Sequence, residues 1–130
     1  MNLELKKLAA DFYVAKVQGF ESSLIERIAS DSNEFWTVSQ TPDEVSVVSN
    51  IASHPSFLTV EGPWSAFRII GQLDFSLTGI LSQCSRFLAD SQISVFAVST
   101  FDTDYFLVRK EAGDSAIAAW RSGGINVELS

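Results

Sequence analysis

The chain has very little of what cross-linked or metal-bound proteins need. Its 130 residues include one cysteine and one histidine, which leaves no cysteine pair for a disulfide and no cysteine and histidine cluster for zinc. A chain of this length buries roughly two thirds of its unfolded surface, so it folds without such cross-links. A reducing, cytoplasmic location is therefore the expectation.

Long apolar runs and basic residues are also scarce. No apolar stretch approaches the roughly 18 residues of a membrane helix, and the charged first seven residues lead into no apolar signal-peptide region or small-residue cleavage site. Nine lysines and arginines oppose 16 aspartates and glutamates, which gives a net charge of −7. Nucleic-acid-binding proteins usually present a basic patch. We therefore expect neither a membrane nor a nucleic acid as a partner.

The usual catalytic and cofactor-binding patterns are missing. His54 precedes a proline in a short loop, and Cys84 lies on an apolar helical stripe, so neither is typical of a catalytic base or nucleophile. No glycine-rich phosphate loop is present. We expect no catalytic residue, no metal and no cofactor. An enzyme that uses Asp102 or Asp104 is kept as an alternative.

The second half of the sequence alternates strand and helix patterns. Residues 64–70 are typical of a strand after a turn at Gly62-Pro63, and the apolar spacing from Ile80 to Leu88 predicts a helix that Thr78 or Ser76 would cap. Two hairpin strands, a helix from Asp114 to Gly123-Gly124 and a last strand complete the order βαββαβ, with the three strands at residues 93–98, 105–108 and 125–129.

The first half repeats this order more weakly. Strands at 12–17, 35–38 and 45–48, a helix at 22–29 and a turn at Thr41–Glu44 are predicted, whereas Pro55 makes a second helix a poor fit. Placing Val38 on Val98 and Glu44 on Asp104, an offset of about 60, brings the hairpins into register. This favours an internal duplication over a chance match.

The order βαββαβ predicts an antiparallel sheet with both helices on one face of each half. The open face and the edge strands need a cover, so we expect the chain to dimerise.

Two polar segments are candidates for ligand binding. In the strand-to-helix loop 72–80, amides near Thr78, Gly79 and Ile80 would be free at the positive end of a helix and would suit a carboxylate. The segment 99–104 offers hydroxyls, a ring and carboxylates, and Asp104 would suit an ammonium or guanidinium group. Helix capping and turn formation are the simpler alternatives for the two segments.

The segments 61–64, 73–81 and 98–105 together resemble small bacterial ACT-domain proteins related to the CASTOR-type arginine sensors, and they are similar to the regulatory ACT modules of aspartate kinases. The resemblance implies an α+β fold of two tandem ferredoxin-like βαββαβ units, with helices on one face of antiparallel sheets. The first ACT-like half, 1–62, would be degenerate, and the second ACT domain would span 63–130.

The resemblance also implies a ligand. In that family a free amino acid sits between ACT units, with its carboxylate on the strand-to-helix loop and the second strand end on its other side. Leu77 stands where the arginine sensors carry acidic character, which favours a smaller or apolar amino acid. The residues expected to bind are Asp74, Leu77, Thr78, Gly79, Ile80, Thr100, Phe101 and Asp104, with Asp104 as the partner of the cation.

The sequence thus predicts a cytoplasmic, non-catalytic, dimeric regulatory ACT protein. Its partners would be a free amino acid or a similar small metabolite, a second copy of the chain, and an unidentified protein whose activity it regulates. The alternative is a structural or protein-interaction module that has the ACT fold, binds no ligand and docks through its open sheet.

Overall fold

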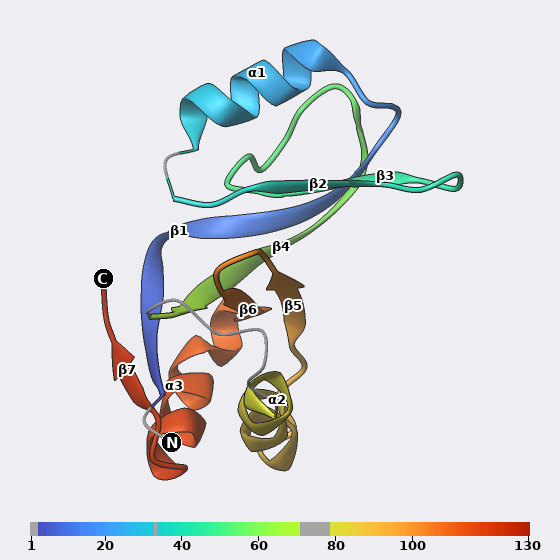
Figure 1. Ribbon diagram of the computed structural model, residues 1–130. Helices are drawn as coiled ribbons and strands as arrows, with labels where there is room; N and C mark the ends of the chain where they lie inside the picture. The colour runs from blue at the N-terminus through green and yellow to red at the C-terminus, as the bar shows by residue number, and fades with distance from the viewer. Residues whose placement is uncertain (1–2, 33, 71–78) are drawn as a thin grey trace. The chain divides into compact units, whose positions relative to one another are not determined.

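The computed structural model describes residues 3–32, 34–70 and 79–130 (Figure 1). The chain divides into two compact units, which we call the small unit, Ala10–Trp64, and the large unit, Met1–Ala9 with Ser65–Ser130. Two long strands, β1 (Glu4–Val17) and β4 (Phe57–Ile69), supply a segment to each unit.

The small unit adds α1 (Ser22–Asp31), β2 (Thr37–Gln40) and β3 (Val45–Ser49) to its parts of β1 and β4. Its strands lie in the order β2-β3-β1-β4. The pairs β1–β3 and β2–β3 are antiparallel, and a hydrogen bond of 3.0 Å from Gln18 N to Ser56 O joins the end of β1 to the segment before β4. The apolar face of α1 packs on this sheet, in a core of Ala15, Val17, Leu24, Ile28, Val45, Val47 and Ile51.

The small unit has one helix among the residues that the structure describes. Residues 50–56 form an irregular connection in place of a second helix, as the sequence around Pro55 indicates. His54 holds this connection, because its Nδ1 atom accepts a hydrogen bond of 3.1 Å from Ser56 N and lies 2.7 Å from Ser56 Oγ.

The large unit follows the predicted order βαββαβ. After its part of β4 come α2 (Ile80–Asp90), β5 (Phe96–Ser99), β6 (Asp104–Arg109), a short 3₁₀ turn η1 (Lys110–Ala112), α3 (Gly113–Ser122) and β7 (Asn126–Glu128). Its strands lie in the order β5-β6-β4-β1, and β7 pairs with β1 in parallel, with Val127 opposite Leu5. The first strand of the chain therefore lies between β4 and β7.

The core of the large unit lies between its sheet and the helices α2 and α3 (Figure 1). Trp120 of α3 is fully buried at its centre, 4.9 Å from the ring of Phe67 and 6.0 Å from that of Phe106 between centroids. The buried residues of this core are Leu3, Leu5, Phe67, Ile69, Ile80, Cys84, Leu88, Phe106, Val108, Ala116, Ile117, Trp120, Ile125 and Val127.

The turn predicted at Gly62-Pro63 is wrong, because β4 runs straight through these residues with a cis peptide bond between them. A side chain at Gly62 would place its Cβ 2.6 Å from Cδ2 of Tyr13, so glycine marks a close approach of the two strands. The first strand also begins at Glu4, eight residues before the predicted start.

The hairpins of the two units are built alike. Thr41 N donates to Glu44 O at 2.8 Å, and Thr100 N donates to Thr103 O at the same distance. In each turn the threonine Oγ1 also accepts from the amide three residues later, at 3.1 Å in the small unit and 3.3 Å in the large unit. The hairpins therefore match with an offset of 59, the separation of Thr41 and Thr100.

The strand pairs confirm this offset. Thr37 opposite Val48 corresponds to Phe96 opposite Leu107, and Gln40 opposite Val45 corresponds to Ser99 opposite Asp104. The sequence alignment that placed Glu44 on Asp104 is therefore wrong by one residue. A shift of one residue exchanges the two faces of a strand.

Candidate functional site

The helix α2 begins at a glycine. Gly79 is its N-cap residue, in the left-handed conformation with φ 82°, and a Cβ built there would meet no atom of the described residues within 4 Å. Its carbonyl accepts the first hydrogen bond of the helix, from Gln83 N at 2.8 Å. Glycine supplies no side-chain cap to the amides of the first turn. The predicted caps, Ser76 and Thr78, lie outside the described residues.

The β5–β6 turn lies at the C-terminal end of β4. Thr103, whose side chain is buried, donates from Oγ1 to the carbonyl oxygen of Ile69 at 2.8 Å. At the tip of the turn the ring of Phe101 is 75% exposed. The hydroxyl of Thr100 bonds to the backbone of Thr103, so part of its role is to form the turn.

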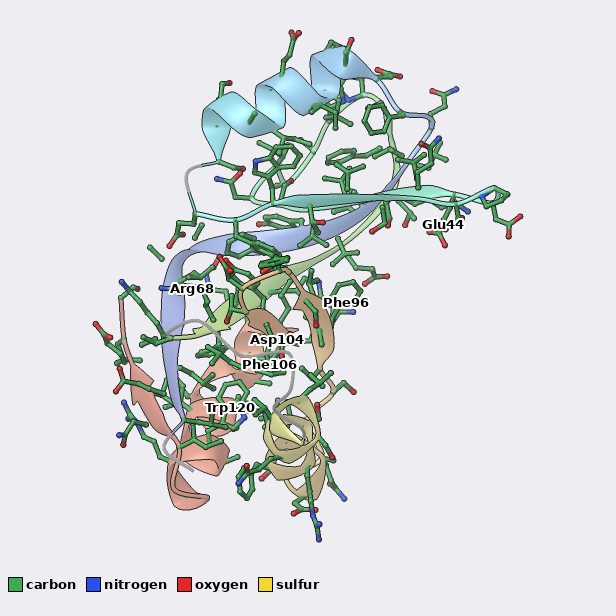
Figure 2. All side chains as sticks on the ribbon, in the orientation of Figure 1. Glu44, Arg68, Phe96, Asp104, Phe106 and Trp120 are labelled. Atoms are coloured by element: carbon green, nitrogen blue, oxygen red, sulfur yellow. The ribbon has the colours of Figure 1, made fainter. Side chains whose placement is uncertain are left out.

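Asp104 is the first residue of β6, and its half-buried side chain faces the helices. It is two residues from Phe106, and residues two apart in a strand share a face. Phe106 packs in the core with Trp120, as both labelled side chains in Figure 2 indicate.

The charge of Asp104 acts on Cys84 of α2. Burial raises the pKa of the Cys84 thiol to about 11, and the negative charge of Asp104 adds to this rise as a second cause. Cys84 is the fifth residue of α2 and is fully buried, and Trp120 Nε1 donates to its carbonyl oxygen at 3.1 Å. The Asp104 carboxylate is therefore within electrostatic reach of Cys84 on α2.

The large unit contains all the predicted site residues that the structure describes, namely Gly79, Ile80, Thr100, Phe101 and Asp104. Ile80 is a core residue, 6% exposed, so only its backbone is suited to a ligand. Asp74, Leu77 and Thr78 lie outside the described residues. Binding by these eight residues stays a prediction.

Sequence reasoning missed two residues near this site. Thr103 anchors the turn to β4, and Cys84 lies close enough to Asp104 for the carboxylate charge to oppose ionisation of the thiol. The pattern of threonines at 100 and 103 was a usable signal for the turn, because threonine hydroxyls commonly bond to the backbone in turns. The proximity of Cys84 and Asp104 depends on the fold and has no local signal.

Two hollows in the surface are lined by residues other than the predicted site residues. A hollow of about 360 Å³ in the small unit is lined by Ser32, Glu34, Phe35 and Trp36, and one of about 450 Å³ in the large unit is lined by Asp114, Ile117, Ala118, Arg121, Ser122 and Leu129.

Over the described ranges, no group of three or more histidine, cysteine or acidic side chains is arranged to hold a metal ion. None of the described helices has the length and apolar character to cross a membrane.

Three solved structures show how widely the fold is shared. A protein from Agrobacterium tumefaciens is 27% identical and has a TM-score of 0.83, covering 100% of this chain and 95% of its own. A protein from Vibrio cholerae, described as of unknown function and a possible transport protein, is 18% identical with a TM-score of 0.75, covering 93% and 89%. The regulatory subunit of aspartate kinase from Thermus thermophilus, in its ligand-free form, is 9% identical with a TM-score of 0.62, covering 87% and 92%.

A search of the curated proteins finds none that matches the sequence. The family model of the ACT domain matches residues 59–122, which run from β4 to the end of α3. ACT domains are regulatory, non-catalytic modules, as in the regulatory subunits of aspartate kinase, and no catalytic family is indicated. The match to the ACT domain thus covers residues 59–122, just under half of the chain.

Proposed function

We propose that the protein is a regulatory ACT protein that binds a free amino acid in its large unit and acts as a homodimer. The observation that carries the proposal is the position of Asp104 at the start of β6, half-buried on the strand face that it shares with the core residue Phe106. ACT domains bind amino acids and often dimerise, which agrees with this assignment.

The chemistry of the two elements suits a zwitterion. The first-turn amides of a helix carry unsatisfied donors and a partial positive charge, which favour a carboxylate. Gly79 has no side chain, so its backbone allows a ligand to approach closely. The carboxylate of Asp104 offers the opposite charge, and hydrogen bonds between charged groups are about twice as strong as neutral ones. An amino acid carries both complementary groups on one carbon atom.

Thermal unfolding with each of the twenty standard amino acids tests the proposal. A ligand at a hundred times its dissociation constant stabilises the folded protein by about 2.7 kcal/mol, which raises the melting temperature by several degrees. At millimolar concentrations we expect at least one amino acid to produce such a rise. If all twenty leave the melting temperature unchanged, amino acid binding is ruled out.

Two variants assign the effect to the site. Asp104→Asn removes the negative charge and should abolish most of the rise, because the ligand ammonium loses its charged partner. Asp43→Asn is the matched control, since Asp43 is an exposed aspartate in the corresponding turn of the small unit. The control should respond like the natural protein. Equal loss in both variants would place the ligand elsewhere.

A second candidate is a protein-interaction module that binds no ligand. It is favoured by β5, which is an edge strand with three of its four residues exposed, Phe96 among them. An exposed edge strand offers unpaired backbone groups to a second chain. This candidate predicts a stable dimer whose melting temperature is indifferent to amino acids.

A further inference from the structure

We infer that each chain holds one amino acid site, in the large unit, and that the small unit lacks the groups to form a second one. This inference rests on the proposed function. Two features of the small unit carry it, one at its hairpin and one at the start of its helix.

The hairpin of the small unit has no acidic residue at the position that corresponds to Asp104. With the offset of 59 that the two threonine turns fix, the residue that corresponds to Asp104 is Val45. Val45 is 8% exposed and packs in the core beneath α1, so the place of the carboxylate is filled by an apolar side chain. A ligand ammonium would meet no charged partner there.

Glu44 does not replace the missing carboxylate. It belongs to the turn itself and is exposed, and Figure 2 shows it at the tip of the β2–β3 hairpin, whereas Asp104 lies on β6. Its backbone amide donates to Thr41 Oγ1 at 3.1 Å, which is the bond that Thr103 makes to Thr100 in the large unit. Glu44 therefore corresponds to the turn residue Thr103 and not to Asp104.

The helix starts differ as well. The N-cap residue of α1 is Glu21 in an extended conformation, whereas that of α2 is the left-handed Gly79. The side chain of Glu21 makes no capping hydrogen bond and places a negative charge at the helix end where a ligand carboxylate would dock. The small unit therefore repels the acid group of an amino acid and offers no partner to its amine.

Native mass spectrometry of the full chain with an equimolar mixture of the twenty standard amino acids tests the inference. The number of adducts per chain gives the stoichiometry, and their mass identifies the amino acid, except that the isomers leucine and isoleucine are told apart by repeating the measurement with each alone. We expect one adduct per chain, saturating as the mixture is titrated. Two saturable adducts per chain would overturn the inference but leave the proposed function standing, whereas no adduct at any concentration would overturn both.

A pair of isosteric variants locates the adduct. Asp104→Asn should weaken binding about tenfold or more, because a hydrogen bond between charged groups is lost. Glu44→Gln removes one negative charge from the other hairpin and should leave the affinity within about twofold, a difference well under the 1.4 kcal/mol of a tenfold change. A loss with Glu44→Gln equal to that with Asp104→Asn would show that the small unit binds too, and would refute the inference.

Discussion

The indole nitrogen of Trp120 donates a hydrogen bond of 3.1 Å to the carbonyl oxygen of Cys84 and so joins α3 to α2. The same indole contacts the rings of Phe67 and Phe106 from the sheet. One side chain thus links both helices and two strands of the large unit.

Replacing Trp120 should lower the free energy of unfolding, and by more with alanine than with phenylalanine. Trp120→Phe keeps much of the ring but loses the hydrogen bond and leaves a small cavity, at a cost of about 1–3 kcal/mol, whereas Trp120→Ala should cost about 3–5 kcal/mol. Urea unfolding followed by circular dichroism measures both. Trp36→Phe is the control, because Trp36 is only half-buried in the small unit. If Trp120→Phe cost no more than the control, the link between the helices would be unimportant.

Replacing Gly79 by alanine should cost about 1–2 kcal/mol of stability. The reason is conformational, since a Cβ there meets no atom within 4 Å but the φ of 82° disfavours any side chain. Gly19→Ala is a matched control, because Gly19 is equally uncrowded and lies outside the left-handed region. Denaturant midpoints compare the two variants. Equal costs would mean that Gly79 does not adopt the left-handed conformation in solution.

Stability should fall between about pH 9 and pH 11 because of Cys84. Exposed thiols titrate at about 8.5, whereas the pKa of Cys84 in the folded protein is about 11, raised first by burial and second by Asp104. In this window the unfolded chain loses its thiol proton and the folded chain keeps it, so folding binds a proton and weakens as the pH rises. The loss should reach about 3 kcal/mol near pH 11.

The alkaline slope is best measured as a difference. Cys84→Ser has no group that titrates in this range at that position, so its stability should fall less steeply than that of the natural protein from pH 9 to pH 11. Comparing the slopes of stability against pH removes the constant cost of burying the serine hydroxyl, because that cost does not change with pH. Parallel slopes would show that the thiol titrates at its ordinary pKa in the folded protein.

The sequence was sufficient for most of the elements because their periodicity is strong. The spacing of Ile80, Cys84 and Leu88 predicts α2, and these three residues are its buried ones. The glycine pair at 123–124 ends α3 as expected. By contrast, residues 4–11 show no alternation of apolar and polar residues, so the first part of β1 was not predicted.

Other details depended on contacts that are distant in sequence. Gly62-Pro63 is a typical turn signal, yet Tyr13 of the neighbouring strand explains why a glycine is needed there. The predicted offset between the hairpins differs from the observed one by a single residue. That residue decides whether the acidic Glu44 or the apolar Val45 corresponds to Asp104. The backbone hydrogen bonds of Thr41 and Thr100 and the strand pairing resolve it.

The candidate site was predictable in its chemistry but only partly in its geometry. Asp104 was recognised as a carboxylate at a strand end, and the structure adds that it faces the helices near Cys84. Ile80 and Thr100 were expected as ligand contacts, but the first is a core residue and the second helps to form the turn. Such competing roles arise from packing, which one sequence does not display.

The pairing of Glu4–Lys6 with Asn126–Glu128 has a consequence for biosynthesis. The strand at Glu4–Lys6 leaves the ribosome long before its neighbour at Asn126–Glu128, so the sheet of the large unit stays incomplete until that neighbour emerges. The segment Ala10–Trp64 is contiguous and can form its own contacts long before. Nascent chains arrested at a length that lets residue 64 clear the ribosomal exit tunnel should therefore resist proteolysis within that segment, while residues 4–9 remain open to cleavage.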